Sequence, residues 1–180
     1  MRTVRRYVAT GLAGALALVA VVLASPAEAR QRQAAVPLAG PVKIEAENYT
    51  KQRGTRIVEV PFASGGRMVD RISDGNWLRY NRVTVQVAGR SFLCFSSPAP
   101  VNTEVATVDV RIGSRSATPI TSIVVRTNVG QEIRQWATGG EMPEGVHTVF
   151  LTVRQPKGAL PFALDYLMFS HLPPPPSLNC

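Results

Sequence analysis

The stretch His147-Thr148-Val149-Phe150-Leu151-Thr152-Val153 carries the pattern that decides the fold. Its residues Val149, Leu151 and Val153 recur at every second position, which is the period of a β-strand with one face in a core. His147 falls on that same face, so we predict a hydrogen-bonded structural histidine rather than a catalytic one. No helical spacing persists for three turns in the chain.

Six further segments resemble this strand, and turn signals separate them. The seven expected strands cover residues 44–47, 77–87, 91–96, 105–112, 120–126, 147–154 and 162–169. The turn signals are Gly65-Gly66, Asp74-Gly75, Ala88-Gly89, Gly113-Ser114, Gly139-Gly140 and Pro143-Glu144-Gly145. Short strands without intervening helices predict an all-β fold, an antiparallel β-sandwich.

The segments on either side of these strands have other compositions. Three arginines precede an apolar run at residues 12–24 and the motif Ala27-Glu28-Ala29, which predicts a signal peptide over residues 1–29 and a secreted, extracellular protein. The run is shorter than a membrane span, so a retained anchor is the weaker interpretation. We expect a flexible leader at 30–41, a folded domain at 42–171 and a proline-rich tail at 172–180.

The net charge of +8 invites a nucleic-acid interpretation, which the distribution of charges does not support. Removing residues 1–29 takes away three arginines and Glu28, and lowers the net charge to +6. The remaining basic residues are scattered and form no basic, aromatic-interleaved helix. We therefore expect no nucleic-acid partner and no membrane partner for the mature form.

The two cysteines are too few to form a disulfide scaffold in a chain of 180 residues. Cys94 lies in the apolar stretch 91–95, where a small buried thiol is favoured over a bridge. Cys180 follows the four prolines 173–176, and three fates stay open for it: pairing with Cys94, a bond to another chain, or a free thiol. We expect a monomer unless Cys180 cross-links.

Alternation also sorts the side chains of the second expected strand. Trp77 shares a face with Arg79 and Asn81, whereas Leu78 and Tyr80 take the other face. Trp77 is therefore either an exposed aromatic residue or one packed under a neighbouring loop.

No group of residues forms a catalytic constellation, so we expect no enzyme activity. His147 lies on a core-patterned strand and His171 beside the prolines, while Cys94 has no basic neighbour that would lower its pKa. The carboxylate pairs Glu141 with Glu144 and Asp70 with Asp74 fall in expected turns, where they favour turn formation and solubility.

Several short motifs in the right order resemble the family 6 carbohydrate-binding modules. They are Ile44-Glu45-Ala46-Glu47-Asn48-Tyr49, Gly65-Gly66-Arg67-Met68-Val69, Ile72-Ser73-Asp74-Gly75-Asn76-Trp77-Leu78-Arg79-Tyr80, Trp136-Ala137-Thr138, Gly145-Val146-His147-Thr148-Val149 and Leu164-Asp165-Tyr166-Leu167-Met168-Phe169. The resemblance covers residues 42–170. It implies a jelly-roll β-sandwich of the galactose-binding-domain type, in agreement with the strand pattern.

The resemblance also implies a structural calcium ion, held by two glutamates of the first strand and an aspartate of the last. Glu45, Glu47 and Asp165 stand at the matching positions, and a main-chain carbonyl near Arg67 would add a ligand. Calcium takes six to eight oxygen ligands, which suits three carboxylates from distant parts of the chain. The alternative is three surface carboxylates near arginines.

At the sugar-binding cleft of the family, this sequence departs from the pattern. Arg71 and Ile133 occupy the positions of the two stacking aromatic residues, and Ala163 replaces an asparagine. Some members bind on a second surface through a tryptophan that Trp77 matches, so the resemblance makes Trp77 a candidate carbohydrate-binding residue. Arg79 is a candidate because it shares the face of Trp77. Trp136 is a further candidate, as an aromatic supplied from another loop.

Arg71 is a candidate for a different reason. With Arg53, Arg56 and Arg67 it would form charge-assisted bonds to an acidic glycan, and the alternative is a set of solvated loop arginines.

The sequence therefore predicts a secreted, non-catalytic module that binds polysaccharide, with calcium as a structural cofactor. One rival is a secreted structural or interaction domain that has lost its sugar site. Another is an accessory fragment of a modular glycoside hydrolase.

Overall fold

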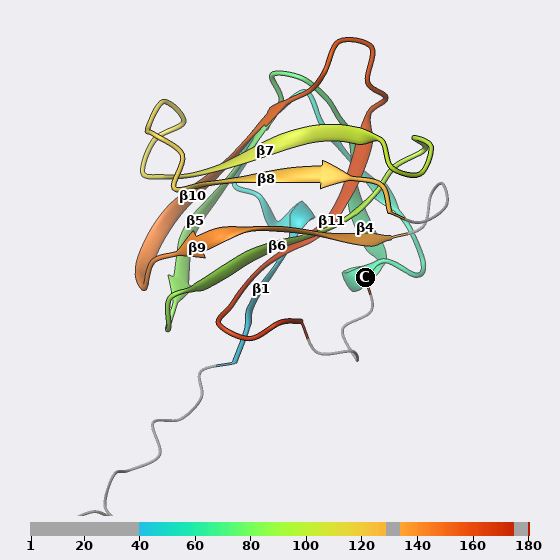
Figure 1. The fold of residues 1–180 in the computed structure, drawn as a ribbon. Helices are drawn as coiled ribbons and strands as arrows, with labels where there is room; N and C mark the ends of the chain where they lie inside the picture. The colour runs from blue at the N-terminus through green and yellow to red at the C-terminus, as the bar shows by residue number, and fades with distance from the viewer. Residues whose placement is uncertain (1–39, 129–133, 175–179) are drawn as a thin grey trace, which may run out of the picture. The chain divides into compact units, whose positions relative to one another are not determined.

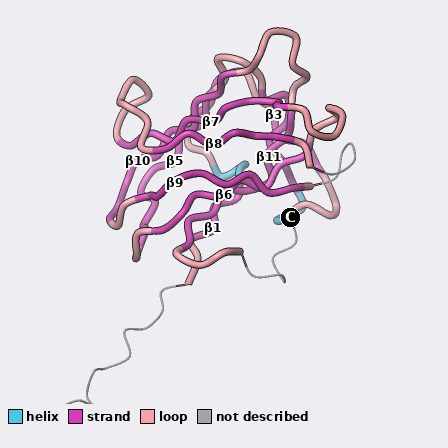
Figure 2. The backbone as a smooth tube through the Cα atoms, viewed as in Figure 1, coloured by secondary structure: helices cyan, strands magenta, loops and turns pink. Residues whose placement is uncertain are grey.

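The computed structural model describes residues 40–128, 134–174 and 180, which form strands and two 3-10 helices (Figures 1 and 2). The predicted signal peptide, residues 30–39 of the leader and Ile133 lie outside the described residues. The elements are β1 (Val42–Glu45), η1 (Ala46–Asn48), β2 (Lys51–Arg53), β3 (Arg56–Glu59), η2 (Ser64–Gly66), β4 (Arg67–Ile72), β5 (Trp77–Val85), β6 (Gly89–Ser96), β7 (Glu104–Ile112), β8 (Thr121–Arg126), β9 (Gln135–Met142), β10 (Gly145–Arg154) and β11 (Phe162–Ser170).

The strands build two antiparallel sheets, which confirms the predicted β-sandwich. The six-stranded sheet has the order β3-β4-β11-β6-β9, and β1 pairs with β11 beyond the end of β4. The five-stranded sheet has the order β2-β5-β10-β7-β8. Figure 1 shows β7 and β8 in one layer and β6 and β9 in the other.

The core lies between the sheets because each strand turns alternate apolar side chains inward. Leu93 and Phe95 of β6 face this core from one sheet, and Ile123 and Leu151 face it from the other. All four side chains are fully buried. In the described residues, no helix has the length and apolar character that crossing a bilayer requires.

Each expected strand coincides with an observed one, with a change at the first. β1 ends at Glu45, so Glu47 lies in the helix η1 and not in the strand. Four observed strands, β2, β3, β4 and β9, were not among those expected. The first two have only three and four residues, so the alternation is too short to be recognised.

The prediction of a turn at Gly139-Gly140 is wrong, because both glycines lie inside β9. Glycine is needed at both positions because strand β8 of the other sheet lies close to them. A Cβ atom on Gly139 would lie 2.4 Å from Ile123 Cγ1, and one on Gly140 would lie 2.9 Å from Thr121 Oγ1. The glycines let the edges of the two sheets come together.

The prediction that Cys94 is a buried free thiol is also wrong. Cys94 is buried, but it forms a disulfide with Cys180, across a sequence separation of 86 residues. Of the three fates left open for Cys180, pairing with Cys94 is the one observed. The apolar residues around Cys94 in the sequence suggested a place in the core between the sheets. Its side chain instead faces outward from the sheet, where Cys180 packs against it.

His147 is hydrogen-bonded, as predicted. Its Nε2 atom lies 3.1 Å from the carbonyl oxygen of Pro143 and 3.2 Å from that of Glu144, so Nε2 carries the proton and donates. A register shift between His147 and Val149 breaks the alternation, and the ring therefore sits at the turn and not in the core.

Candidate functional site

The outer face of the five-stranded sheet carries two rows of side chains in cross-strand register. We call this surface the open face. One row contains Arg53, Trp77, Thr152, Asp109 and Ser122, and the other contains Lys51, Arg79, Phe150 and Arg111. Neighbours along the same strands, such as Leu78, Val110 and Leu151, belong to the core. The rows therefore face away from the core.

Trp77 forms the aromatic centre of the open face. It is half-buried, and its ring centroid lies 6.2 Å from that of Phe150, with the planes tilted by 49°. The guanidinium of Arg115, from the connection between β7 and β8, lies over the Trp77 ring at 5.4 Å. Trp77 is thus partly exposed and partly covered by a loop residue, so the structure combines the two alternatives left by the sequence.

A pocket of about 310 Å³ opens beside this tryptophan. Arg53, Trp77, Arg111 and Arg115 contribute its large side chains, and the rest of the lining comes from Gly75, Asn76, Thr152 and Val153. The pocket joins an aromatic surface to hydrogen-bond donors, which is the combination that sugar recognition requires.

Asp109 organises the polar side of the open face. It is 1% exposed and accepts hydrogen bonds from Arg111 at 2.8 Å, Arg154 at 2.9 Å and Ser122 at 2.7 Å. Burial acts to raise the pKa of Asp109, but the bonds from Arg154 and Ser122 outweigh it and hold the pKa below its ordinary value. Asp109 therefore stays ionised and fixes two guanidinium groups.

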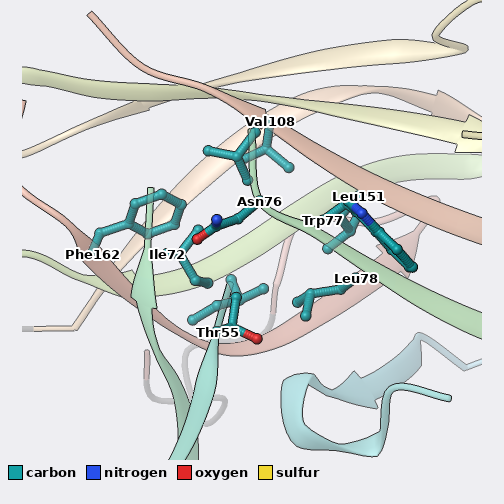
Figure 3. Close-up of a pocket in the computed structure, with 10 residues that line it drawn as sticks. Thr55, Ile72, Asn76, Trp77, Leu78, Val108, Leu151 and Phe162 are labelled. Atoms are coloured by element: carbon teal, nitrogen blue, oxygen red, sulfur yellow. The ribbon is translucent and has the colours of Figure 1, made fainter. Parts of the chain in front are cut away.

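Beneath Trp77 lies an apolar void, which Figure 3 shows with its lining side chains. Its volume of about 10 Å³ is barely enough to admit a single water molecule. Ile72, Val108 and Leu151 lie around it. The void is too small for a sugar ring, so a ligand of Trp77 has to bind on its outer side.

A second pocket, of about 460 Å³, lies where the β3–β4 and β10–β11 connections approach each other. Ala163, Asp70 and Arg134 line it, together with Phe62, whose exposed fraction is 73%. Arg71 is exposed and is not part of this lining. Its φ of 59° is unusual for a residue with a side chain.

The four arginines of the acidic-glycan hypothesis are not gathered in one place. Arg56 pairs with Asp70 at 2.8 Å, and Arg67 lies 3.7 Å from Glu47. Arg53 lines the pocket at Trp77, whereas Arg71 lines neither that pocket nor the one at Ala163.

The three carboxylates of the expected calcium site all border the helix η2: Ser64 donates its hydroxyl to Glu45 and its backbone N–H to Asp165, and Gly65 lies beside Glu47. Burial raises the pKa of Glu47 and the pKa of Asp165, and repulsion from Glu45 adds to both. Each carboxylate has one partnered oxygen: Ser64 donates to Glu45 at 2.8 Å, Arg134 donates to Asp165 at 2.7 Å, and Arg67 faces Glu47.

The second oxygen of each carboxylate is buried without a hydrogen-bond partner among the described residues. These atoms are Glu45 Oε2, Glu47 Oε2 and Asp165 Oδ1. A Cβ atom on Gly65 would lie 3.1 Å from Glu47 Oε1, so the glycine keeps space open beside them. In the described part of the chain, no three acidic, histidine or cysteine side chains are arranged so that they could hold a metal ion. The donor set nevertheless suits a hard cation such as calcium.

Comparison of the sequence with known families identifies the family of the chain. The family described as carbohydrate binding module (family 6) matches residues 45–171. The chain belongs to this family. A comparison with curated proteins gave no match.

Solved structures similar to this family 6 module share its fold. One is a beta-1,3-glucan binding module of the family from Bacillus halodurans, with a TM-score of 0.61 and 23% identity over 71% of this chain and 94% of that one. Another is a family 6 module from Clostridium cellulolyticum in complex with xylose, with a TM-score of 0.58 and 23% identity over 71% and 95%.

A third similar structure belongs to a larger protein. It is a family 43 arabinoxylan arabinofuranohydrolase from Bacillus subtilis, with a TM-score of 0.61 and 18% identity. The match covers 71% of this chain and 26% of that one.

Trp136 lies in a different sheet of the module from the candidate residues Trp77 and Arg79. It lies on β9 in the six-stranded sheet, whereas Trp77 and Arg79 lie on β5 in the other. The Trp136 ring packs edge-to-face on Phe92 and Tyr166, with centroid distances of 6.1 and 5.4 Å. Trp136 thus belongs to a packed cluster and not to a loop.

Two aromatic residues of the module's surface were missed by the sequence analysis. Phe150 has the parity of an outward residue, but its place beside Trp77 depends on the pairing of β5 with β10, which alternation does not reveal. Phe62 is a single aromatic residue outside any strand pattern. The one signal that could have indicated its exposure is its position directly after Pro61.

Proposed function

We propose that this family 6 module is a secreted, non-catalytic protein that binds polysaccharide on its open face, at Trp77 and Phe150. The observation that carries the proposal is the pocket of about 310 Å³ beside Trp77, on an outward sheet face. The C–H face of a sugar ring stacks on an aromatic surface, and the surrounding polar groups bind its oxygens.

The pocket at Phe62 is a second candidate site for the same function. Phe62 is 73% exposed, and a large aromatic side chain left in solvent is common at binding surfaces. Ala163 in its lining removes an amide partner, while Arg134 and Asp70 supply polar groups. Phe62 would then replace the stacking residue lost at Arg71.

The binding experiment is affinity electrophoresis through gels that contain xylan, β-glucan, polygalacturonate, a sulfated galactan or no polysaccharide. We expect the wild type to be retarded, and Trp77→Ala to abolish the retardation. Phe62→Ala reports on the second pocket, and Val146→Ala, on an exposed strand residue outside both pockets, is the control. Loss of binding in Phe62→Ala alone would assign the site to the second pocket, and absence of retardation in every gel would favour an interaction domain.

We further propose a structural calcium ion at Glu45, Glu47 and Asp165. The support is the set of buried oxygens without partners, one on each carboxylate. When bound, the ion would neutralise their mutual repulsion and join η1 and β1 to β11, the last strand.

The calcium proposal has its own test. A ligand that binds only the folded state raises the melting temperature, so we expect calcium to raise it and a chelator to lower it. Glu47→Gln should remove this response, whereas Glu59→Gln, an exposed glutamate on β3, should retain it. A melting temperature that changes with neither calcium nor chelator would contradict the site. Cleavage of the signal peptide is tested by N-terminal sequencing of the exported protein, which should begin at Arg30.

A further inference from the structure

We infer that the pocket beside Trp77 selects anionic glycans, whose carboxylate or sulfate groups are bound by Arg53, Arg111 and Arg115. The inference rests on the proposed function, because it names the class of polysaccharide bound at the same site. It differs from an acidic-glycan site at Arg71, which does not line this pocket.

The charge of the open face is strongly unbalanced. Its two rows contain Lys51, Arg53, Arg79 and Arg111, and Arg115 reaches over them from its loop. The only carboxylate in these rows is Asp109, which is shared between Arg111 and Arg154. In the described part of the chain, Arg53, Arg79 and Arg115 form no ion pair.

Arg111 is the fixed anchor of the site. Its guanidinium is held by Asp109 at 2.8 Å, by Thr152 Oγ1 at 3.1 Å and by the carbonyl oxygen of Ala117. Its side chain is 18% exposed. A partly buried guanidinium held in one orientation loses little conformational entropy when it binds an anion.

Both side-chain oxygen acceptors that line the pocket, Asn76 Oδ1 and Thr152 Oγ1, already accept hydrogen bonds. Asn76 Oδ1 accepts from the backbone N–H and the hydroxyl of Ser73, and Thr152 Oγ1 accepts from Arg111. Arginine has five donors and no acceptor. Sugar hydroxyls donate as well as accept, so a neutral ligand would find few acceptors here. A carboxylate or sulfate supplies only acceptors, which matches the donors that remain.

Arg115 couples charge recognition to stacking. Its guanidinium lies 5.4 Å over the Trp77 ring, in the space that a sugar ring would take. Arg115 is exposed and lies on a connection between strands, so it can move aside at low cost. An anionic sugar retains the arginine as a partner for its acidic group while the ring replaces the guanidinium on Trp77. A neutral sugar displaces Arg115 without giving it a new partner.

The test uses matched pairs of polysaccharides in affinity gels. One pair is polygalacturonate and its methyl ester, and the other is a sulfated galactan and its desulfated form. We expect the charged member of one or both pairs to retard the wild type at least about tenfold more strongly, the effect of losing one charge-assisted hydrogen bond. The pair that shows the difference identifies carboxylate or sulfate as the group recognised.

The variants separate this site from general positive charge. Arg53→Gln and Arg115→Gln should each weaken binding of the charged polymer about tenfold. Arg90→Gln removes the same charge from an exposed position of β6 in the other sheet, and should leave binding unchanged. Melting curves for each variant establish that it is folded.

A spectroscopic readout tests the exchange at Trp77. The chain has two tryptophans, so Trp136→Phe leaves Trp77 as the single reporter. Trigalacturonate or a sulfated galactan oligosaccharide should change its fluorescence, and Arg115→Gln should reduce that response.

Each alternative result has a defined meaning. Equal retardation by the charged and neutral members, abolished by Trp77→Ala, would retain the proposed function and overturn the anion selectivity. Equal losses in Arg90→Gln and Arg115→Gln, or equally strong retardation by double-stranded DNA, would show non-specific attraction and also overturn it. Retardation by no polysaccharide would overturn both proposals.

Discussion

The two sheets of this module have very different outer faces, although each carries one tryptophan. On the six-stranded sheet, Phe92, Cys94, Trp136, Tyr166 and Met168 form an apolar cluster with Cys180, which we call the covered face. On the open face, Trp77 is surrounded by arginines and borders a pocket. The comparison teaches that the same residue type contributes to packing or remains available to a ligand according to what covers it.

The chain end makes the difference. The disulfide fixes Cys180 on the covered face, and Lys43 lies 4.3 Å over the ring of Tyr166. Burial and the nearby Asp165 raise the pKa of Tyr166 to about 12. On the open face, the residue over the tryptophan is a single exposed arginine that can move.

The largest effect should come from removing the disulfide of the covered face. A cross-link across 86 residues stabilises the fold by about 4–5 kcal/mol through the entropy of the unfolded chain. We expect Cys180→Ser to lower the free energy of unfolding by about this amount in a urea titration. Reduction of the wild type should give a similar loss, and glycan binding on the open face should persist where the variant is folded. A loss below about 1 kcal/mol would mean that the covered face does not depend on the bridge.

The next effect concerns the buried carboxylate of the open face. Asp109→Asn leaves Arg111 without its ionic partner, and we expect a loss of about 2–3 kcal/mol at pH 7. Because the folded-state pKa of Asp109 is lowered, its contribution is present above the unfolded pKa, near 4, and disappears as the pH falls through the folded value.

Wild type and Asp109→Asn should therefore begin to converge in stability below about pH 4 and meet once the pH is below the folded-state pKa of Asp109, in urea titrations at a series of pH values. Asp70→Asn, which removes a more exposed partner of Arg56, should cost less than about 1 kcal/mol and serves as the control. A difference that is independent of pH would argue against an ionised Asp109 as the cause.

The third comparison exchanges the roles of the two tryptophans. Trp136→Ala removes packing on Phe92 and Tyr166 and should cost about 2 kcal/mol of stability, with glycan binding unchanged. Trp77→Ala should abolish glycan binding at a smaller cost in stability. Melting curves and affinity gels measure the two properties separately. If Trp136→Ala abolished binding in a folded protein, the division between the faces would be wrong.

The smallest effect should follow from Arg79→Gln on the open face. Arg79 has no ion pair in the described residues, and its guanidinium lies 5.7 Å over Phe150. We expect a stability change within about 0.5 kcal/mol by urea titration. A change above about 1.5 kcal/mol would show that Arg79 has a structural role and is not free to bind a ligand.

Among the described residues, the sequence predicted six of the eight strands that have six or more residues, and it missed β4 and β9. It failed where tertiary contacts decide the local structure. Gly139 resembles a turn residue in the sequence, but glycine is needed there because a Cβ atom would collide with Ile123 of the opposing sheet. Cys94 has the appearance of a core thiol, and its partner lies 86 residues away.

The candidate site was predicted in part, for the same reason. The outward face of Trp77 follows from parity along one strand, whereas the rows that bring Phe150 and Arg111 beside it depend on the pairing of three strands. Arg115 comes from a connection whose path no periodicity describes. The carboxylates Glu45, Glu47 and Asp165 were identified by family resemblance, because residues about 120 positions apart carry no local signal.

The position of β11 has a consequence for the order of folding. This last strand pairs with β1 and β4 on one side and with β6 on the other, and β10 lies between β5 and β7 in the second sheet. The centre of each sheet is therefore the part synthesised late. A growing chain can form hairpins, but neither sheet is complete until residues 145–170 have been made. Such non-local pairing folds slowly, so the module reaches its native state only after synthesis of the whole domain.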